Sequence, residues 1–234
     1  MIDVIELPGA RAIFSTRNGG VSEGAYRSLN LGILTDDDPE CVTENRRRLA
    51  RELGIPPDDV AMGWQVHGTE IKEWADAGPG YAAPGAELPK VDGHTTEEQD
   101  LALLVLVADC YPVALVGGGR VAMLHCGWRG LAGGIIDRAL AMFAEPPAAA
   151  VGPGIGACCY EVGDEVRAEF AQVPGAVSGR GLDLRSVIAH GLREGGVEHA
   201  EHLDRCTSCR GDLYFSHRRD HGVTGRQSGV VLRA

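Results

Sequence analysis

Apolar residues along the chain form short runs that predict strands and longer amphipathic stretches that predict helices. Helices are expected over Pro39 to Leu53, Leu131 to Phe143, Val162 to Phe170 and Leu184 to Glu194. Strands are expected near Ala12, Val60, Leu101, Val113, Val121, Ala149 and Val230. Mixed elements of this kind predict an α/β (α+β) sandwich.

Two successive apolar runs, Leu101 to Ala108 and Val121 to Leu124, are connected through a triple glycine at positions 117–119. They predict a hairpin or an adjacent strand pair, and Val113 to Val116 belongs either to the first strand or to a separate one. The stretch Asp76 to Pro89 is rich in Gly, Ala and Pro and predicts a surface loop.

Cys110 and His125 end these two apolar runs, where ligands from neighbouring strands can converge. His67 lies in a similar context, Gly-Trp-Gln-Val-His-Gly. Two imidazoles and a thiolate suit zinc, and a site with three protein ligands leaves a fourth position for water or substrate. Any one of the three alone is more often a packed histidine or a buried thiol than a ligand.

The sequence resembles the laccase-domain-containing purine nucleoside phosphorylase family, formerly labelled multicopper polyphenol oxidoreductases, over nearly its whole length. The matching segments are Phe14–Ser22, Ser28–Gly32, Glu44–Arg46, Gln65–Gly68, Ala108–Pro112, His125–Gly130, Gly152–Gly156, Cys159–Val162, Cys206–Cys209, Phe215–Arg219 and Gly225–Gln227. The resemblance implies one domain over residues 1–234, built as a sandwich of mixed β-sheets covered by helices. It also implies that His67, Cys110 and His125 are the zinc ligands and part of the catalytic machinery.

The family resemblance implies cleavage of purine nucleosides by phosphate, with adenosine, inosine and S-methyl-5'-thioadenosine all remaining candidate substrates. Deamination of adenosine is expected at most as a side activity of the same site, because the usual deaminase signature is absent. Some positions depart from the family pattern. Tyr111 replaces an aliphatic residue, Cys126 replaces an alanine and adds a thiol able to compete for metal, and the segment from Asp92 is more polar than usual.

The amino-acid composition limits the classes of binding partner that are expected. The chain has 234 residues, 33 of them acidic and 22 Lys or Arg, and a net charge of −11, which disfavours nucleic acid and anionic membranes as partners. The N-terminal residues show no signal-peptide pattern, and no apolar run is long enough to span a bilayer, so a cytoplasmic location is expected. The expected partners are a purine nucleoside and phosphate, and the expected state is a monomer or a weak homodimer.

Cysteines and histidines restrict the metal chemistry. The seven cysteines are an odd number and are expected as thiols or metal ligands rather than disulfides. A second zinc at Cys206 and Cys209, with His202 as a possible third ligand, is disfavoured because a single Cys-x-x-Cys is a weak signal. The eight histidines show no repeated His-x-His pairs, so zinc is expected rather than copper and a polyphenol oxidase is poorly supported.

Several polar residues in the matching segments are candidates for binding substrate. Arg17, Arg46 and Arg129 form a set able to clamp phosphate, although each alone is as easily explained as a partner of surface carboxylates. Gln65 shares a strand face with His67 and is a candidate for contacting the purine or a water molecule. For Asp109 a structural role is slightly favoured. Arg218, Arg219 and Arg226 either line the cleft or balance surface acids, and are left out of the predicted site.

Two other functions stay open at this stage. Without metal, Cys110 is a candidate nucleophile with His125 or His67 as its base, which gives a hydrolase or amidase. That activity would suit the family's reported connection with peptidoglycan-precursor editing. The other alternative is a metal-binding accessory module without enzymatic activity.

Overall fold

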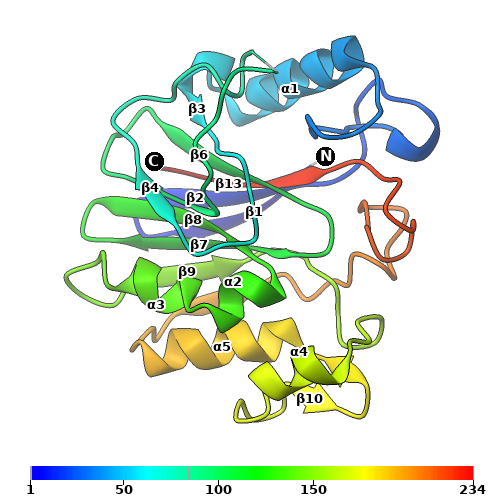
Figure 1. Ribbon diagram of the computed structural model, residues 1–234. Helices are drawn as coiled ribbons and strands as arrows, with labels where there is room; N and C mark the ends of the chain where they lie inside the picture. The colour runs from blue at the N-terminus through cyan, green and yellow to red at the C-terminus, as the bar shows by residue number, and fades with distance from the viewer. Residues whose placement is uncertain (1, 84, 234) are drawn as a thin grey trace.

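Two β-sheets packed face to face form the centre of the structure, a computed structural model that describes residues 2–83 and 85–233 (Figure 1). The first sheet has the spatial order β1-β2-β13-β6-β3, in which only the β6–β3 pair is parallel. Its strands are β1 (Ile2–Leu7), β2 (Ala10–Ser15), β3 (Val60–Ala61), β6 (Ala102–Val107) and β13 (Gln227–Arg233).

The second sheet has the order β12-β9-β7-β8-β5-β4, with parallel pairs at its two edges and antiparallel pairs between them. Its strands are β4 (Ile71–Glu73), β5 (Gly93–Thr96), β7 (Tyr111–Gly117), β8 (Arg120–Cys126), β9 (Ala148–Val151) and β12 (Ala200–His202). A separate small hairpin pairs β10 (Val177–Ser178) with β11 (Gly181–Leu182). Both large sheets are therefore mixed, as the sequence predicts.

Strand β7 shows why these strands are apolar on both faces. Val113 and Leu115 point toward the helices, whereas Ala114 and Val116 point toward the first sheet. Successive side chains of a strand point to opposite faces, so a strand covered on both sides needs a continuous apolar run. The expected sandwich of mixed sheets covered by helices is confirmed.

Helices cover the outer faces of the two sheets (Figure 1). Helix α1 (Pro39–Leu53) lies on the first sheet; α2 (Trp128–Ala132), α3 (Ile135–Leu140), α4 (Asp164–Glu169) and α5 (Leu184–Glu194) lie on the side of the second. Short 3-10 turns, η1 and η2, occupy Gly24–Tyr26 and Pro57–Asp59. In the part of the chain that the structure describes, every helix is too short or too polar to cross a bilayer.

The bounds of α1 follow from its capping residues. The Asp38 carboxylate accepts a hydrogen bond from the Glu40 N–H, and Pro39 occupies the first turn, where its missing N–H costs nothing. Gly54 ends the helix with φ 76°, a left-handed conformation that glycine adopts without strain. The predicted helix over Pro39 to Leu53 is therefore confirmed to the residue.

Two predictions need correction. The helix expected over Leu131 to Phe143 is two short helices, because Gly134 adopts φ 84° between α2 and α3. The runs at Leu101 and Val121 do not pair with each other, since β6 and β8 lie in different sheets and β8 pairs with the separate strand β7. The expected loop over Asp76 to Pro89 contains no regular helix or strand in its described residues; Pro84 lies outside them.

Candidate functional site

The ligating atoms of His67, Cys110 and His125 lie within 4.8 Å of one another. His67 belongs to the loop between β3 and β4, and Cys110 to the link between β6 and β7. His125 lies near the end of β8, where it pairs with Pro112 of β7. The two imidazole rings meet edge to face at 4.8 Å between centroids. The fold thus brings together three side chains that no local spacing connects.

Asp92 orients both histidines. One oxygen accepts hydrogen bonds from His125 Nδ1 (2.7 Å) and from the backbone N–H of His67 (2.9 Å). The other accepts from the N–H groups of Val66 (3.0 Å) and Gly68 (2.7 Å). An ionised carboxylate only accepts hydrogen bonds, so Nδ1 of His125 carries a proton, and Nε2 is the nitrogen that remains to bind a metal once it is deprotonated.

The loop around His67 adopts a conformation that Asp92 stabilises. His67 has φ 60°, which is uncommon for a residue with a side chain. Burial alone raises the pKa of Asp92, but hydrogen bonds from His125 and the backbone N–H groups lower it overall. The carboxylate therefore stays ionised and holds the loop against β8. Sequence reasoning missed this role, although an aspartate directly before a buried strand is a usable signal.

Gly127 lets the backbone approach two of the three side chains, Cys110 and His67. A Cβ atom at this position would lie 3.0 Å from Cys110 Sγ and 3.0 Å from His67 Cδ2. Such contacts are closer than carbon and sulfur normally tolerate, so a side chain here would displace one of the ligands. The glycine that follows Cys126 is therefore part of the geometry of the site.

Cys110 and His125 shift each other's protonation. Burial raises the pKa of the Cys110 thiol, but the charge and hydrogen bond of His125, with a hydrogen bond from His67, lower it overall to about 6. Burial lowers the pKa of His125, but Cys110 and Asp92 raise it overall to about 9. The thiolate is the form that binds metals and attacks electrophiles, so this arrangement favours the reactive form of Cys110.

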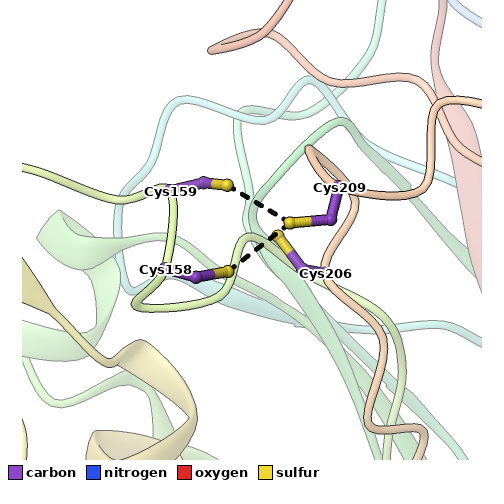
Figure 2. Close-up of side chains that lie close together, drawn as sticks. All are labelled: Cys158, Cys159, Cys206 and Cys209. Carbon is purple, nitrogen blue, oxygen red and sulfur yellow. Dashed lines mark hydrogen bonds between the residues drawn. The ribbon is translucent and has the colours of Figure 1, made fainter.

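The donor set fits a soft or borderline metal ion. Two imidazole nitrogens and a thiolate converge, His125 is oriented by a carboxylate, and His67 is exposed toward the adjoining cavity. These three residues could hold one metal ion with a further coordination position facing the cavity. Among the described residues, one more group of this kind exists, formed by four cysteines on a separate pair of loops (Figure 2).

A cavity of about 470 Å³ adjoins the three side chains. Its volume is in the range of small-molecule sites. Two tryptophans, a tyrosine, three arginines and a histidine contribute to its wall, namely Trp64, Trp128, Tyr160, Arg129, Arg218, Arg226 and His217. Aromatic faces and guanidinium groups in one cavity can bind a planar base and an anion together.

Two of the four predicted substrate-binding residues, Gln65 and Arg129, line this cavity. The Gln65 amide is already paired with the backbone, since it donates to Leu106 O (2.7 Å) and accepts from Leu106 N (2.8 Å). Arg129 is exposed and stacks over the ring of Trp128 at 4.3 Å. Arg129 is therefore the better placed of the two for contacting a ligand.

Arg46 and Arg17, the other two predicted substrate-binding residues, are not among the residues that line this cavity. Arg46 is only 2% exposed and donates to the carbonyl oxygens of Leu31, Gly80 and Tyr81. Arg17 donates to Arg27 O and Gly211 O and lies over the ring of Phe215. These contacts use the guanidinium groups to join loops to the body of the protein.

Asp109 lies in the link between β6 and β7 rather than within a strand, and it both lines the cavity and fixes neighbouring segments. Its oxygens accept hydrogen bonds from Thr207 Oγ1 (2.7 Å) and from the Arg218 N–H (2.7 Å), and its backbone has φ 94°. The carboxylate thus fixes the link that carries Cys110. Arg218 and Arg226, which the predicted site omits, do line the cavity, and nothing local in the sequence distinguishes them from surface arginines.

Cys126 does not compete for the metal. It is 0% exposed and packs in the core between the second sheet and the helices. Neighbouring residues of a strand point to opposite faces, so Cys126 points away from His125. The suggestion that this thiol competes for metal is therefore wrong.

Known proteins resemble the chain over nearly its whole length. The profile of the multi-copper polyphenol oxidoreductase laccase family matches residues 11–234. Purine nucleoside phosphorylase YlmD of Geobacillus stearothermophilus is 37% identical, covering 96% of this chain and 90% of the relative. Purine nucleoside phosphorylase YfiH of Escherichia coli is 36% identical, covering 95% and 93%.

A solved structure shares the fold. The crystal structure of YlmD from Geobacillus stearothermophilus superposes with a TM-score of 0.90 at 36% identity, covering 97% of this chain and 93% of that one. The sequence match and the structural match thus cover the same nearly complete chain. The chain belongs to the multi-copper polyphenol oxidoreductase laccase family, whose members include the laccase-domain-containing purine nucleoside phosphorylases.

Proposed function

We propose that this protein is a zinc-dependent purine nucleoside phosphorylase, contained in a single domain over residues 1–234. Its substrates would be adenosine, inosine or S-methyl-5'-thioadenosine, which phosphate cleaves to the free base and a ribose 1-phosphate or its methylthio analogue. The names of the relatives support the reaction class. Deamination of adenosine would be a side activity of the same site.

One observation carries the proposal: a three-residue ligand set faces a cavity that also contains arginines and aromatic rings. His67, Cys110 and His125 would hold the zinc. Bound there, zinc would supply a Lewis acid beside the cavity. Zinc has no redox chemistry, which is why this assignment disagrees with the oxidoreductase wording in the family's description.

Phosphorolysis needs an anion site next to a nucleoside site. Arg129, Arg218 and Arg226 would bind phosphate, because guanidinium groups match the geometry of phosphate oxygens. Burial lowers the pKa of Arg226. An arginine side chain nevertheless remains a cation at neutral pH. The arginines would hold the attacking phosphate oxygen near the ribose. The electron pair of the glycosidic bond leaves with the purine, so negative charge develops on the base.

The purine would lie against the aromatic side chains of the cavity. Trp64 is 38% exposed and Tyr160 is half-buried, so both present ring surface to a ligand. Stacking excludes water from the glycosidic bond and favours phosphate over water as the nucleophile. His217, also in the lining, is placed to donate a hydrogen bond to the base or the sugar.

The closeness of Cys110 to two imidazoles favours a second candidate, a hydrolase or amidase that uses this thiolate as its nucleophile. The nitrogens of His125 and His67 lie within 4.8 Å of the sulfur, so either could serve as the base of a cysteine enzyme. The two candidates differ in one measurable property. A thiolate bound to zinc resists alkylation, whereas a catalytic cysteine is alkylated rapidly.

The deciding experiment is chromatography of the products formed from adenosine, with and without phosphate, by wild-type protein of measured zinc content. Cys110→Ala is the test variant and Cys41→Ala, in α1, is its matched thiol control. Adenine that requires phosphate, and that disappears only in Cys110→Ala, is the expected result. Formation of inosine without adenine would show that the protein deaminates adenosine instead of cleaving it with phosphate. Neither product, together with rapid alkylation of Cys110, would overturn the proposal in favour of the hydrolase.

A further inference from the structure

Four cysteines gather at the surface, outside the cavity described above. Cys158 and Cys159 come from the loop between β9 and α4, and Cys206 and Cys209 from the long segment between β12 and β13. Their sulfur atoms all lie within 4.8 Å of one another, and they point toward a common centre from two facing loops (Figure 2). From the sequence, a site at Cys206 and Cys209 is disfavoured, with His202 as a possible third ligand; in the structure the side chains grouped with these two cysteines are Cys158 and Cys159.

The sulfur positions match a tetrahedral metal site. The Cys209 sulfur lies 3.6 Å from that of Cys158 and 3.4 Å from that of Cys159. A zinc ion about 2.3 Å from each of four sulfurs leaves neighbouring sulfurs about 3.8 Å apart. A disulfide requires about 2.05 Å between sulfurs, and all four cysteines are free thiols. The spacing therefore fits a shared ion better than a pair of disulfides.

Backbone hydrogen bonds hold the two pairs of ligands in place. Each pair lies in a tight turn, closed by Cys159 N to Gly156 O (2.9 Å) in one loop and Arg210 N to Cys206 O (3.0 Å) in the other. The turns are joined by a bridge between Gly154 and Cys206. Gly156 N–H also donates to Cys206 Sγ (3.2 Å). A backbone N–H bonded to sulfur stabilises a thiolate ligand.

We propose that Cys158, Cys159, Cys206 and Cys209 form a structural zinc site that joins these two loops. Four protein ligands complete the tetrahedron, so the ion has no position for a substrate. Binding converts the thiols to thiolates and releases their protons to solvent. The assignment goes beyond the proposed function and does not depend on it.

The site has a clear structural purpose. Residues 203–226 form a long connection without helix or strand, and such connections are rare unless something orders them. The segment contributes His217, Arg218 and Arg226 to the cavity. The facing loop contributes Tyr160. A metal ion between the two loops would therefore order two parts of the cavity wall at once.

The experiment measures zinc per chain in full-length protein purified under reducing conditions, by mass spectrometry of the metal. Cys209→Ser is the test variant: Cys209 is exposed, so the substitution leaves no cavity in the core. Cys41→Ser is the matched control. We expect Cys209→Ser to lose one zinc per chain and to melt about 5–10 °C lower, with Cys41→Ser unchanged.

Cobalt substitution in the Cys110→Ala background isolates the four-cysteine site from the cavity site. With Cys209 present, we expect the sulfur-to-cobalt charge-transfer bands of a tetrathiolate site. Cys209→Ser should lose these bands. Cys209→His restores a ligand, so it should keep the bands at altered energies. Unchanged zinc in Cys209→Ser would overturn the proposal, as would iron in place of zinc. A disulfide between two of the four cysteines in metal-free protein would overturn it as well. Failure of phosphorolysis would leave all these readouts intact.

Discussion

Two clusters of residues that could hold a metal ion differ in the number of ligands they offer and in their surroundings. The cavity cluster of His67, Cys110 and His125 offers three ligands, a carboxylate that orients the two histidines and a cavity beside them. The four-cysteine cluster has a complete set of four, held by tight turns at the surface. An incomplete ligand set leaves room for chemistry, whereas a complete one contributes to folding.

Metal removal should separate the two clusters most strongly. During slow dialysis against a chelator under reducing conditions, we expect phosphorolysis to fall about 1000-fold or more, because the cavity site has fewer ligands and loses its metal first. The melting temperature should fall later in the dialysis than the activity does. Activity and thermal unfolding are measured on the same samples, and zinc is added back as the control. A melting temperature that falls before activity would reverse the assignment of the two clusters.

Asp92→Asn tests the support of the cavity cluster alone. An amide cannot accept hydrogen bonds from His125 and from the three backbone N–H groups as a carboxylate does, so we expect metal affinity at this site to drop about 10–100-fold. Competition titration against a colorimetric chelator measures it. Asp100→Asn, on the surface, is the matched control. Equal affinity in both variants would remove Asp92 from the site.

Substituting arginines beside the two clusters should have different effects on the KM for phosphate. Arg129→Ala is expected to raise the KM for phosphate about 10-fold or more, because a charged hydrogen bond to the anion is lost. Arg210→Ala is the control. Arg210 lies next to Cys209 and its guanidinium is paired with Asp212, so the KM of this variant for phosphate should be unchanged. Initial rates at varied phosphate measure both. Equal effects would mean that Arg129 does not contact phosphate.

The smallest effect is expected for Cys126, which belongs to neither cluster. Cys126→Ala removes a buried sulfur from the core and should destabilise the protein by about 1–2 kcal/mol, or a few degrees in Tm. The zinc content should stay at the wild-type value. Cys41→Ala provides the comparison for a less buried thiol. A loss of zinc in Cys126→Ala would show that this thiol takes part in the cavity cluster.

Local signals made some elements predictable from the sequence. Helices α1 and α5 agree with their predicted bounds, since Asp38 and Asp183 cap their first turns and Gly54 and Gly195 follow their ends. Strand β5 was missed because its sequence, Gly-His-Thr-Thr, is polar. The structure pairs the hydroxyl groups of its two buried threonines: Thr95 Oγ1 donates to Val121 O and Thr96 Oγ1 to Trp74 O. Such partners lie far along the chain, so no local pattern reveals them.

The candidate site was predictable only in part for the same reason. Cys110 and His125 end apolar runs and His67 lies in a similar context, so local sequence indicates all three residues, and the resemblance supports them as a ligand set. The roles of Asp92 and Arg46 depend on the backbone groups that surround them after folding. The four cysteines show the limit most clearly. The two pairs, Cys158–Cys159 and Cys206–Cys209, lie far apart along the chain, and long-range contacts such as the pairing of β9 with β12 and the bridge between Gly154 and Cys206 bring them together.

The position of β13 in the first sheet affects how the protein is made. This strand follows the other strands along the described chain, yet it lies between β2 and β6 and pairs with both. During synthesis on a ribosome, the two halves of the sheet cannot join until β13 has emerged. Until then, the unpaired edges of β2 and β6 are open to aggregation, so a nascent chain of this protein should depend on chaperones late in translation.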